Sequence, residues 1–238
     1  MRPLTLSDST LRDGNHAVAQ KLDFSKVGRF IGLVDQARIG WIEVGHGNGL
    51  AASSLNFGKS PNTDEQILRI ARDNVKEALL SVHVMPGIAT FDRDIGPAID
   101  LGVDIFRVAS HCSEADTTLK MMSQILEAGK TPVGVLMMAH RLQPSEFAKQ
   151  AKVMYESGAS AVFIMDSAGS LDRTQTMERV EALMELGMGE VGFHAHNNRG
   201  LAVSNSIAAI EAGASIIDGT AGGFGAGSGN AQMEALIA

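Results

Sequence analysis

The sequence contains few residues of the kinds that would point to secretion or to polyanionic partners. Cys112 is the only cysteine among 238 residues, which excludes an intrachain disulfide and is typical of a reducing compartment, so we expect a cytoplasmic protein. Lys and Arg number 20 against 27 Asp and Glu, the formal net charge is -7, and the basic residues form no cluster. This distribution excludes the basic surface that a nucleic acid or an anionic membrane would require.

Long apolar runs are also missing. No stretch reaches the roughly 18 apolar residues of a membrane-spanning helix, and the opening segment MRPLTLSDST is too short in apolar residues for a signal peptide. Hydrophobic residues nevertheless make up 45% of the chain, which is enough for one large buried core. We therefore expect a single domain over residues 1–238, a small-molecule substrate, and neither nucleic acid nor membrane as a partner.

Short apolar segments alternate with amphipathic helical segments, and each pair takes about 25 to 35 residues, the length of a βα unit. The predicted strands are Leu4–Ser7, Trp41–Val44, Leu79–Met85, Ile105–Ala109, Pro132–Met138, Ala161–Met165, Glu190–His194 and Ala214–Asp218. The predicted helices are Ser25–Gln36, Thr63–Ala78, Asp92–Leu101, Glu114–Ala128, Pro144–Ser157, Leu171–Leu186 and Leu201–Ala212.

Glycines mark the ends of these helices. Five of them directly follow a helical segment, where a left-handed residue is favoured: Gly102, Gly129, Gly158, Gly187 and Gly213. Eight strands joined by helical crossovers, with no GxGxxG after the first strand, favour a closed (β/α)8 TIM barrel over an open doubly wound sheet. The eighth unit looks truncated, because the chain stops at NAQMEALIA, which reads as the opening of a helix. We expect further residues in the natural protein, or a partner chain, to cover that edge.

Polar residues gather where the first and seventh predicted strands end, and the C-terminal ends of the strands are where such barrels carry their active sites. The first strand runs into DSTLRDGNH, residues 8–16, and the seventh into HAHNN, residues 194–198. Residues two apart on an extended strand point to the same side, so His194 and His196 can converge on one point. Barrel closure brings the first and seventh strands close enough for Asp13 to add an oxygen ligand.

Two imidazoles and one carboxylate would leave open positions on a divalent cation such as Mn²⁺, Mg²⁺ or Co²⁺. Taken alone, an HxH pair could instead lie on an exposed loop or consist of core histidines bound to backbone. It could also indicate a metallo-hydrolase barrel, but those proteins carry the pair on the first strand, whereas here it follows the seventh. The position of the pair favours a metal site at the barrel mouth.

DSTLRDG at 8–14 and HAH at 194–196 resemble the barrel superfamily of pyruvate aldolases and acyl-CoA lyases and synthases. More closely, and over essentially its whole length, the chain resembles the metal-dependent 4-hydroxy-2-oxovalerate aldolases. Further matching segments are EVGHGNGL at 43–50, the serines at 53–54, RVASHCSEAD at 107–116, VLMM at 135–138, MDSAG at 165–169 and GAGSGNA at 225–231.

The resemblance implies cleavage of a 4-hydroxy-2-oxo acid to pyruvate and an aldehyde, with Mn²⁺ as the first choice of metal. It implies these roles: metal ligands Asp13, His194 and His196, enolate-stabilising cation Arg12, catalytic base His16 and carboxylate-binding residue Ser167. Physical reasoning agrees, since C–C cleavage beside a 2-keto group places negative charge on the keto oxygen, which a metal and a guanidinium both stabilise. A histidine titrates in the range needed to take the 4-hydroxyl proton. A Schiff-base mechanism would need a lysine, and the predicted strand exits hold none.

Several assignments have alternatives. His16 could be a solvent-facing loop residue, and Arg12 a structural ion-pair partner of Glu43. Asn230 matches a metal-associated asparagine of related lyases, although glycine-rich segments also simply allow tight turns. Asp8 and Glu43 could orient Arg12 or the ligands. Four further residues could line the mouth or bond neighbouring backbone: His46, Arg107, His111 and His140.

The sequence departs from the family at two places. His83 and Met85 fall where the aldolases carry apolar residues that line the aldehyde pocket, so we expect a preference for a polar or carboxylated aldehyde. The family also continues into a C-terminal helical domain, absent from this chain, which contributes a tyrosine and a docking surface for an acylating aldehyde dehydrogenase. The only tyrosine here, Tyr155, falls in a predicted helix. The resemblance also implies a homo-oligomer.

Two other functions stay open at this point. One is a Claisen-type lyase or synthase acting on acyl-CoA, although its members usually carry a glutamine near the place of His16, and no basic cradle for the CoA phosphates is evident. The other is a non-catalytic barrel that serves as an assembly subunit.

Overall fold

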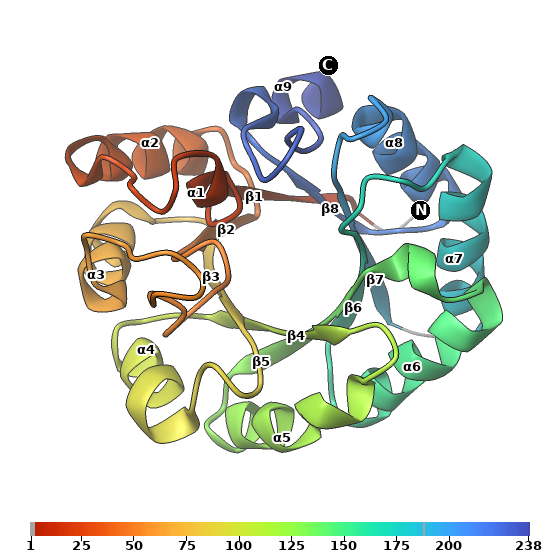
Figure 1. Cartoon of the computed structure of the whole chain (residues 1–238), viewed down its shortest axis with the longest axis horizontal. Coiled ribbons are helices and arrows are strands. Elements are labelled where there is room, and N and C mark those ends of the chain that lie inside the picture. The colour runs from red at the N-terminus through yellow and green to blue at the C-terminus, as the bar shows by residue number, and fades with distance from the viewer. Residues whose placement is uncertain (1–2, 188) are drawn as a thin grey trace.

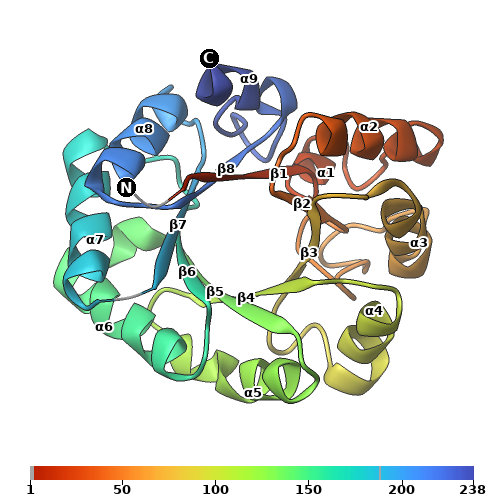
Figure 2. The same ribbon diagram turned by 180° about the vertical axis from the view of Figure 1, so that it is seen from behind.

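A computed structural model describes residues 3–187 and 189–238. In these residues eight parallel strands close into a barrel in chain order, and helices form a ring around it (Figures 1 and 2). The strands are β1 Thr5–Leu11, β2 Trp41–Val44, β3 Leu79–Val84, β4 Ile105–His111, β5 Thr131–Met137, β6 Ala161–Asp166, β7 Glu190–Ala195 and β8 Ile216–Gly219. The α-helices are α1 Gly14–Ala17, α2 Phe24–Gln36, α3 Asp64–Asn74, α4 Gly96–Asp100, α5 Leu119–Glu127, α6 Pro144–Glu156, α7 Arg173–Glu185, α8 Ala202–Ala212 and α9 Met233–Ile237. Short π or 3-10 turns are η1 Phe91–Ile95, η2 Ala115–Thr118, η3 Ala139–Arg141 and η4 Ala221–Gly223.

The predicted TIM barrel is confirmed. β1 pairs with both β2 and β8, so that Ser7 lies opposite Trp41 on one side and Asp218 on the other. The five glycines expected after helices all have positive φ, between 67° and 114°. These glycines therefore mark the helix ends for the expected reason, since glycine adopts the left-handed conformation without the steric penalty of a Cβ atom.

Some predicted boundaries were wrong. The first strand does not end at Ser7 but continues to Leu11, through an irregularity between Asp8 and Leu11 in its pairing with β2. The helix predicted as Thr63–Ala78 is α3, and it ends at Asn74. The carboxylate of Asp35 accepts the backbone N–H groups of residues 76–78, which therefore do not continue the helix.

Two of the predicted helices also begin differently. The segment predicted as Asp92–Leu101 consists of η1 followed by α4, and the segment predicted as Glu114–Ala128 consists of η2 followed by α5. η1 is a wider π turn and η2 a tighter 3-10 turn, and each precedes an α-helix that is shorter than predicted.

The inside of the barrel changes from apolar to charged along the strands. Trp41, Ile105 and Ile216 belong to the inner apolar cluster near the starts of β2, β4 and β8. Two residues further along each strand, side chains again point inward. These next inward residues are Glu43, Arg107 and Asp218, all buried. A charged layer thus lies directly below the mouth of the barrel.

The last helix, α9, lies between α8 and α2 (Figure 1) and packs over β8. The helix opening expected in the final segment is therefore present. A Cβ added to Gly219 would meet Met233 and Leu236 at 3.1 Å, which shows how closely α9 approaches the strand. Among the described residues, no helix is long and apolar enough to cross a membrane.

Candidate active site

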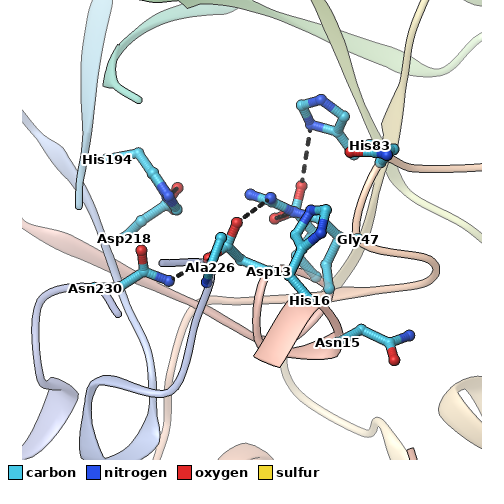
Figure 3. A network of polar contacts seen from close by, with 12 residues as sticks. Asp13, Asn15, His16, Gly47, His83, His194, Asp218, Ala226 and Asn230 are labelled. Atoms are coloured by element: carbon cyan, nitrogen blue, oxygen red, sulfur yellow. Dashed lines mark hydrogen bonds and ion pairs between the residues drawn. The ribbon is translucent and has the colours of Figure 1, made fainter. Parts of the chain in front are cut away.

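The structure brings together the three residues predicted to bind metal. Asp13 follows β1, His194 lies in β7 and His196 directly follows that strand. One potential ligand atom from each lies within 4.8 Å of the others, and all three residues are buried. The two imidazole rings meet edge to face, with centroids 5.0 Å apart. Figure 3 shows His194 beside Asp218 on one side of Asp13.

Asp13 is held by donors on both of its oxygens. Oδ1 accepts a hydrogen bond from Arg12 Nη1 at 2.8 Å, while Oδ2 accepts from Asn230 Nδ2 at 2.6 Å and from the Ala226 amide at 3.0 Å. Burial opposes ionisation, but Arg12 and the two histidines hold the pKa of Asp13 well below its usual range. The carboxylate therefore stays negative at neutral pH, and Asn230 lies beside the proposed ligands, bound to Asp13.

The histidines are suited to donate lone pairs. Burial lowers the pKa of His196 to about 4, so this ring is neutral at pH 7. His194 Nδ1 lies 2.8 Å from Asp218 Oδ2, and a carboxylate can only accept, so the ring carries its hydrogen on Nδ1. His194 Nε2 is buried and has no hydrogen-bond partner among the described residues. A buried, unpartnered nitrogen lone pair beside an ionised carboxylate fits a divalent cation.

Arg12 lies between this cluster and Glu43. Its Nε donates to Glu43 Oε2 and its Nη1 to Asp13 Oδ1, both at 2.8 Å. Burial disfavours the charged guanidinium, but the two carboxylates keep its pKa above the ordinary value. Nη2 is buried without a partner in the described part of the chain. Arg12 is thus both an ion-pair partner of Glu43 and a cation with an unused donor at the site.

His16 is half-buried near the mouth, and its pKa is lowered, chiefly by burial. Its Nδ1 lies 3.2 Å from Gln20 Nε2, while Gln20 Oε1 accepts the Gly47 amide at 2.8 Å. The Gly47 N–H can only donate, which fixes the amide nitrogen of Gln20 toward His16. His16 Nδ1 is therefore an acceptor here, and the neutral ring carries its hydrogen on Nε2.

A cavity of about 240 Å³, which we call the active-site cavity, opens beside these residues. Ser167 lines it after β6, and Ser167 Oγ accepts the Met138 amide at 2.9 Å. His83 and Met85 line another part of its wall. Burial lowers the pKa of His83 to about 4, and its Nδ1 lies 3.7 Å from Glu43 Oε1, too far for a hydrogen bond. The full lining is Arg12, Asp13, His16, Gly47, Asn48, His83, Met85, Met137, Met165, Ser167, His196, Asn198, Ala226 and Gly227.

The role expected for Asp8 is not supported. Its carboxylate accepts hydrogen bonds from the backbone and hydroxyl of Thr10, and none to Arg12 or the proposed ligands is found in the described residues. The reason is the extension of β1, which keeps Asp8 inside the strand instead of in the loop that carries Arg12.

Three residues at the site were missed or misplaced by the sequence analysis. Asp218 was treated only as a strand end, although its position two residues after Ile216 signals an inward side chain. Arg107, which from the sequence could line the mouth or bond neighbouring backbone, is instead fully buried within the barrel and paired with Asp218. Gln20 gave no signal, because its position depends on left-handed backbone at Ala19 and Gln20, with φ of 49° and 65°.

The chain is similar to known proteins over nearly its whole length. The HMGL-like family profile matches residues 3–238. The 4-hydroxy-2-oxovalerate aldolase of Spirochaeta aurantia is 51% identical over 99% of this chain and 69% of the relative. The proteins of the same name from Pectobacterium atrosepticum and Burkholderia pseudomallei K96243 are 44% and 46% identical, over 100% and 99% of this chain and 69% and 67% of theirs.

Solved structures support the fold alone, since their identities are low. The N-terminal domain of a Bacteroides vulgatus protein aligns with a TM-score of 0.84 at 24% identity, over 98% of this chain and 78% of that one. The carboxyl transferase domain of Rhizobium etli pyruvate carboxylase, with pyruvate and biocytin, aligns with a TM-score of 0.86 at 19% identity, over 100% and 43%. On the sequence matches, the chain belongs to the HMGL-like family and, within it, to the family of the 4-hydroxy-2-oxovalerate aldolases.

Proposed function

We propose that this protein is a divalent-metal-dependent aldolase that cleaves a 4-hydroxy-2-oxo acid, such as 4-hydroxy-2-oxovalerate, to pyruvate and an aldehyde. The observation that carries the proposal is the convergence of Asp13, His194 and His196 beside the unused donor of Arg12. The names of the relatives agree with it. The active-site cavity, at about 240 Å³, lies below the size of sites for drug-sized ligands and suits a small 2-oxo acid.

Asp13, His194 and His196 would hold the metal, with Mn²⁺ as the first candidate and Mg²⁺ or Co²⁺ as alternatives. A bound divalent cation would act as a Lewis acid that stabilises negative charge on the 2-keto oxygen. The Asn230 and Ala226 donors keep Asp13 in position, since both bind the oxygen that does not face Arg12.

Arg12 stabilises the pyruvate enolate. When the bond between C3 and C4 breaks, its electrons form the enolate, and negative charge develops on the former keto oxygen. Arg12 Nη2 is desolvated before substrate arrives, so a hydrogen bond from it to that oxygen requires little reorganisation. The fork of Arg12 is fixed by Glu43 and Asp13, which aims the remaining donor.

His16 takes the proton of the 4-hydroxyl as the aldehyde forms. This requires a lone pair on Nε2, because Nδ1 faces Gln20. The resting contact with Gln20 favours the opposite tautomer, so the hydrogen must move to Nδ1 and the Gln20 contact must loosen before His16 acts as a base. Gln20 thereby tunes the basicity of His16.

Ser167 binds the carboxylate of the pyruvate half. A hydroxyl has one hydrogen, and since Ser167 Oγ already accepts from the Met138 amide, its hydrogen is available for a substrate oxygen. At the other end, His83 and Met85 line the place of the aldehyde. A neutral His83 offers a polar contact there, so we propose that the preferred aldehyde is polar or carboxylated.

The finer assignments on partners and location belong to the same proposal. The family resemblance supports a homo-oligomer and an acylating aldehyde dehydrogenase that consumes the aldehyde. The single cysteine supports a cytoplasmic location. We further propose that the barrel over residues 1–238 is one catalytic domain.

The deciding experiment measures pyruvate release from 4-hydroxy-2-oxovalerate by protein freed of metal and then supplied with Mn²⁺. We expect turnover with Mn²⁺ only, and Asp13→Ala should abolish it. Turnover without metal would overturn the mechanism. Tight Mn²⁺ binding without turnover of this or a carboxylated analogue would favour a non-catalytic barrel, and turnover of an acyl-CoA would favour the Claisen-type alternative.

A further inference from the structure

Arg107 and Asp218 form a buried pair that spans the barrel. They lie on β4 and β8, 111 residues apart in sequence, and both are at most 1% exposed. Arg107 Nη1 donates to Asp218 Oδ1 at 3.1 Å, and Nη2 to Oδ2 at 2.6 Å. Two parallel hydrogen bonds between a guanidinium and a carboxylate fix the plane of both groups. The orientation of Asp218 is therefore set by Arg107.

Asp218 in turn orients His194. Its Oδ2 accepts the hydrogen of His194 Nδ1 at 2.8 Å, which leaves the lone pair on Nε2, the buried nitrogen without a partner in the described residues. A carboxylate behind a metal-binding histidine fixes both the tautomer and the direction of the ring. Both oxygens of Asp218 already accept hydrogen bonds from Arg107, so the group faces His194 as an acceptor.

Arg107 also reaches the other half of the site. Its Nη1 lies 3.3 Å from Glu43 Oε2, the same oxygen that accepts the Arg12 Nε hydrogen bond. The guanidinium carbon lies 4.1 Å from the centroid of the Phe163 ring, a contact that further fixes its plane. One guanidinium thus contacts the carboxylate that orients a proposed metal ligand and the carboxylate that orients Arg12.

We propose that Arg107 is a positioning residue that couples the two halves of the site, by holding Asp218 behind His194 and Glu43 behind Arg12. The proposal deepens the proposed function and rests on it for the role of Arg12, but its prediction for metal binding stands without any turnover. It assigns no contact with substrate to Arg107, which is absent from the lining of the active-site cavity.

The test compares Arg107→Lys and Asp218→Asn with Arg72→Lys as the control. Lysine keeps the charge but loses the two-pronged contact. Asparagine keeps the shape, but in either orientation it sets an N–H₂ against an Arg107 N–H, because Arg107 donates to both Asp218 oxygens. Arg72 contacts Asp104 at 3.4 Å outside the barrel, so its variant should not affect the site. The measurements are Mn²⁺ affinity of metal-free protein by titration calorimetry, circular dichroism, and kcat at saturating Mn²⁺.

We expect both barrel variants to bind Mn²⁺ about 10- to 100-fold more weakly with an unchanged circular dichroism spectrum, and the control to match the wild type. For Arg107→Lys, kcat should remain low at saturating Mn²⁺, because Arg12 is also displaced. Wild-type affinity in either barrel variant would overturn the proposal. If a barrel variant fails to fold, nitrogen NMR of the metal-free wild type decides, since a His194 ring with its hydrogen on Nε2 would contradict it. If the two variants bind Mn²⁺ more weakly but the wild type itself releases no pyruvate, the proposed function is refuted while the role of Arg107 toward His194 stands.

Discussion

The buried carboxyl of Asp8 should make the folded protein less stable as the pH rises. Asp8 is 2% exposed, and burial raises its pKa to about 7, from an ordinary value of 3.8. The nearby carboxylates of Asp218 and Glu234 also raise it, while two hydrogen bonds from Thr10 oppose the shift. Asp8→Asn removes the ionisable proton and keeps the shape of the side chain.

The sign follows from proton binding. Between pH values of about 4 and about 7 the folded protein holds a proton that the unfolded chain has already lost, so the free energy of unfolding falls as the pH rises through this window. The penalty is absent well below pH 3.8 and complete above pH 7, where it reaches about 4 kcal/mol. Between pH 5 and pH 8 the change amounts to about 2 to 3 kcal/mol.

The assay is urea unfolding followed by circular dichroism at both pH values, with a chelator present throughout so that metal binding does not contribute. The free energy of unfolding of Asp8→Asn, taken relative to that of the wild type, should rise by about 2 to 3 kcal/mol from pH 5 to pH 8. Asp35→Asn is the control. Burial opposes ionisation of Asp35, but its hydrogen bonds from the amides of residues 76–78 hold its pKa below the ordinary value. Its variant should therefore be destabilised about equally at both pH values. If the free energy of unfolding, relative to the wild type, changed equally little between pH 5 and pH 8 in both variants, the reasoning would be refuted.

Three further predictions concern the site. Gln20→Glu places an acceptor beside His16 Nδ1, which should raise the His16 pKa and move the acidic limb of the kcat/KM profile for pyruvate release to higher pH. Gly225→Ala would place a Cβ 2.2 Å from Asn230 Nδ2, so calorimetry should show Mn²⁺ affinity reduced about tenfold with the fold retained. His83→Leu should shift selectivity from carboxylated to apolar aldehydes, measured as the ratio of kcat/KM values for the two substrates.

Each of these predictions has a contrary result, and Gly225→Ala also has a control. For Gly225→Ala, the control is Gly32→Ala on α2, where an added Cβ meets nothing within 4 Å, and equal affinities in the two variants would contradict the prediction. An acidic limb that stays in place in Gln20→Glu would mean that Gln20 does not tune His16. Unchanged aldehyde selectivity in His83→Leu would mean that His83 does not contact the aldehyde.

The sequence was sufficient to predict the convergence of Asp13, His194 and His196, because that depends on two regular features. One is the alternation of side chains along β7, and the other is the strand order of a closed barrel, which places β1 two strands from β7. Neither feature requires knowledge of side-chain conformations, so residue order alone was informative.

What the sequence could not predict depends on contacts between distant segments. The meeting of Arg107 with Asp218 depends on how far two side chains reach across the barrel interior. The end of α3 at Asn74 depends on Asp35, which lies on α2 and captures the following amides. The misassigned end of β1 has a local cause, since the irregularity after Asp8 extends the strand through residues that read as a loop.

The charges of the buried layer provide a physical link between the metal and the substrate. Leaving the histidines aside, the buried charged side chains around the proposed metal position comprise two cations and three anions, a net charge of -1: Arg12 and Arg107, and Asp13, Glu43 and Asp218. A divalent cation would change this to +1. Since isolated charges are costly to bury, the excess of one carboxylate favours metal binding, and the resulting positive charge favours an anionic 2-oxo acid. Replacing buried ion pairs by apolar residues of similar volume is often neutral or stabilising, so folding alone does not require the charged layer, and ligand binding is the reason we propose for it.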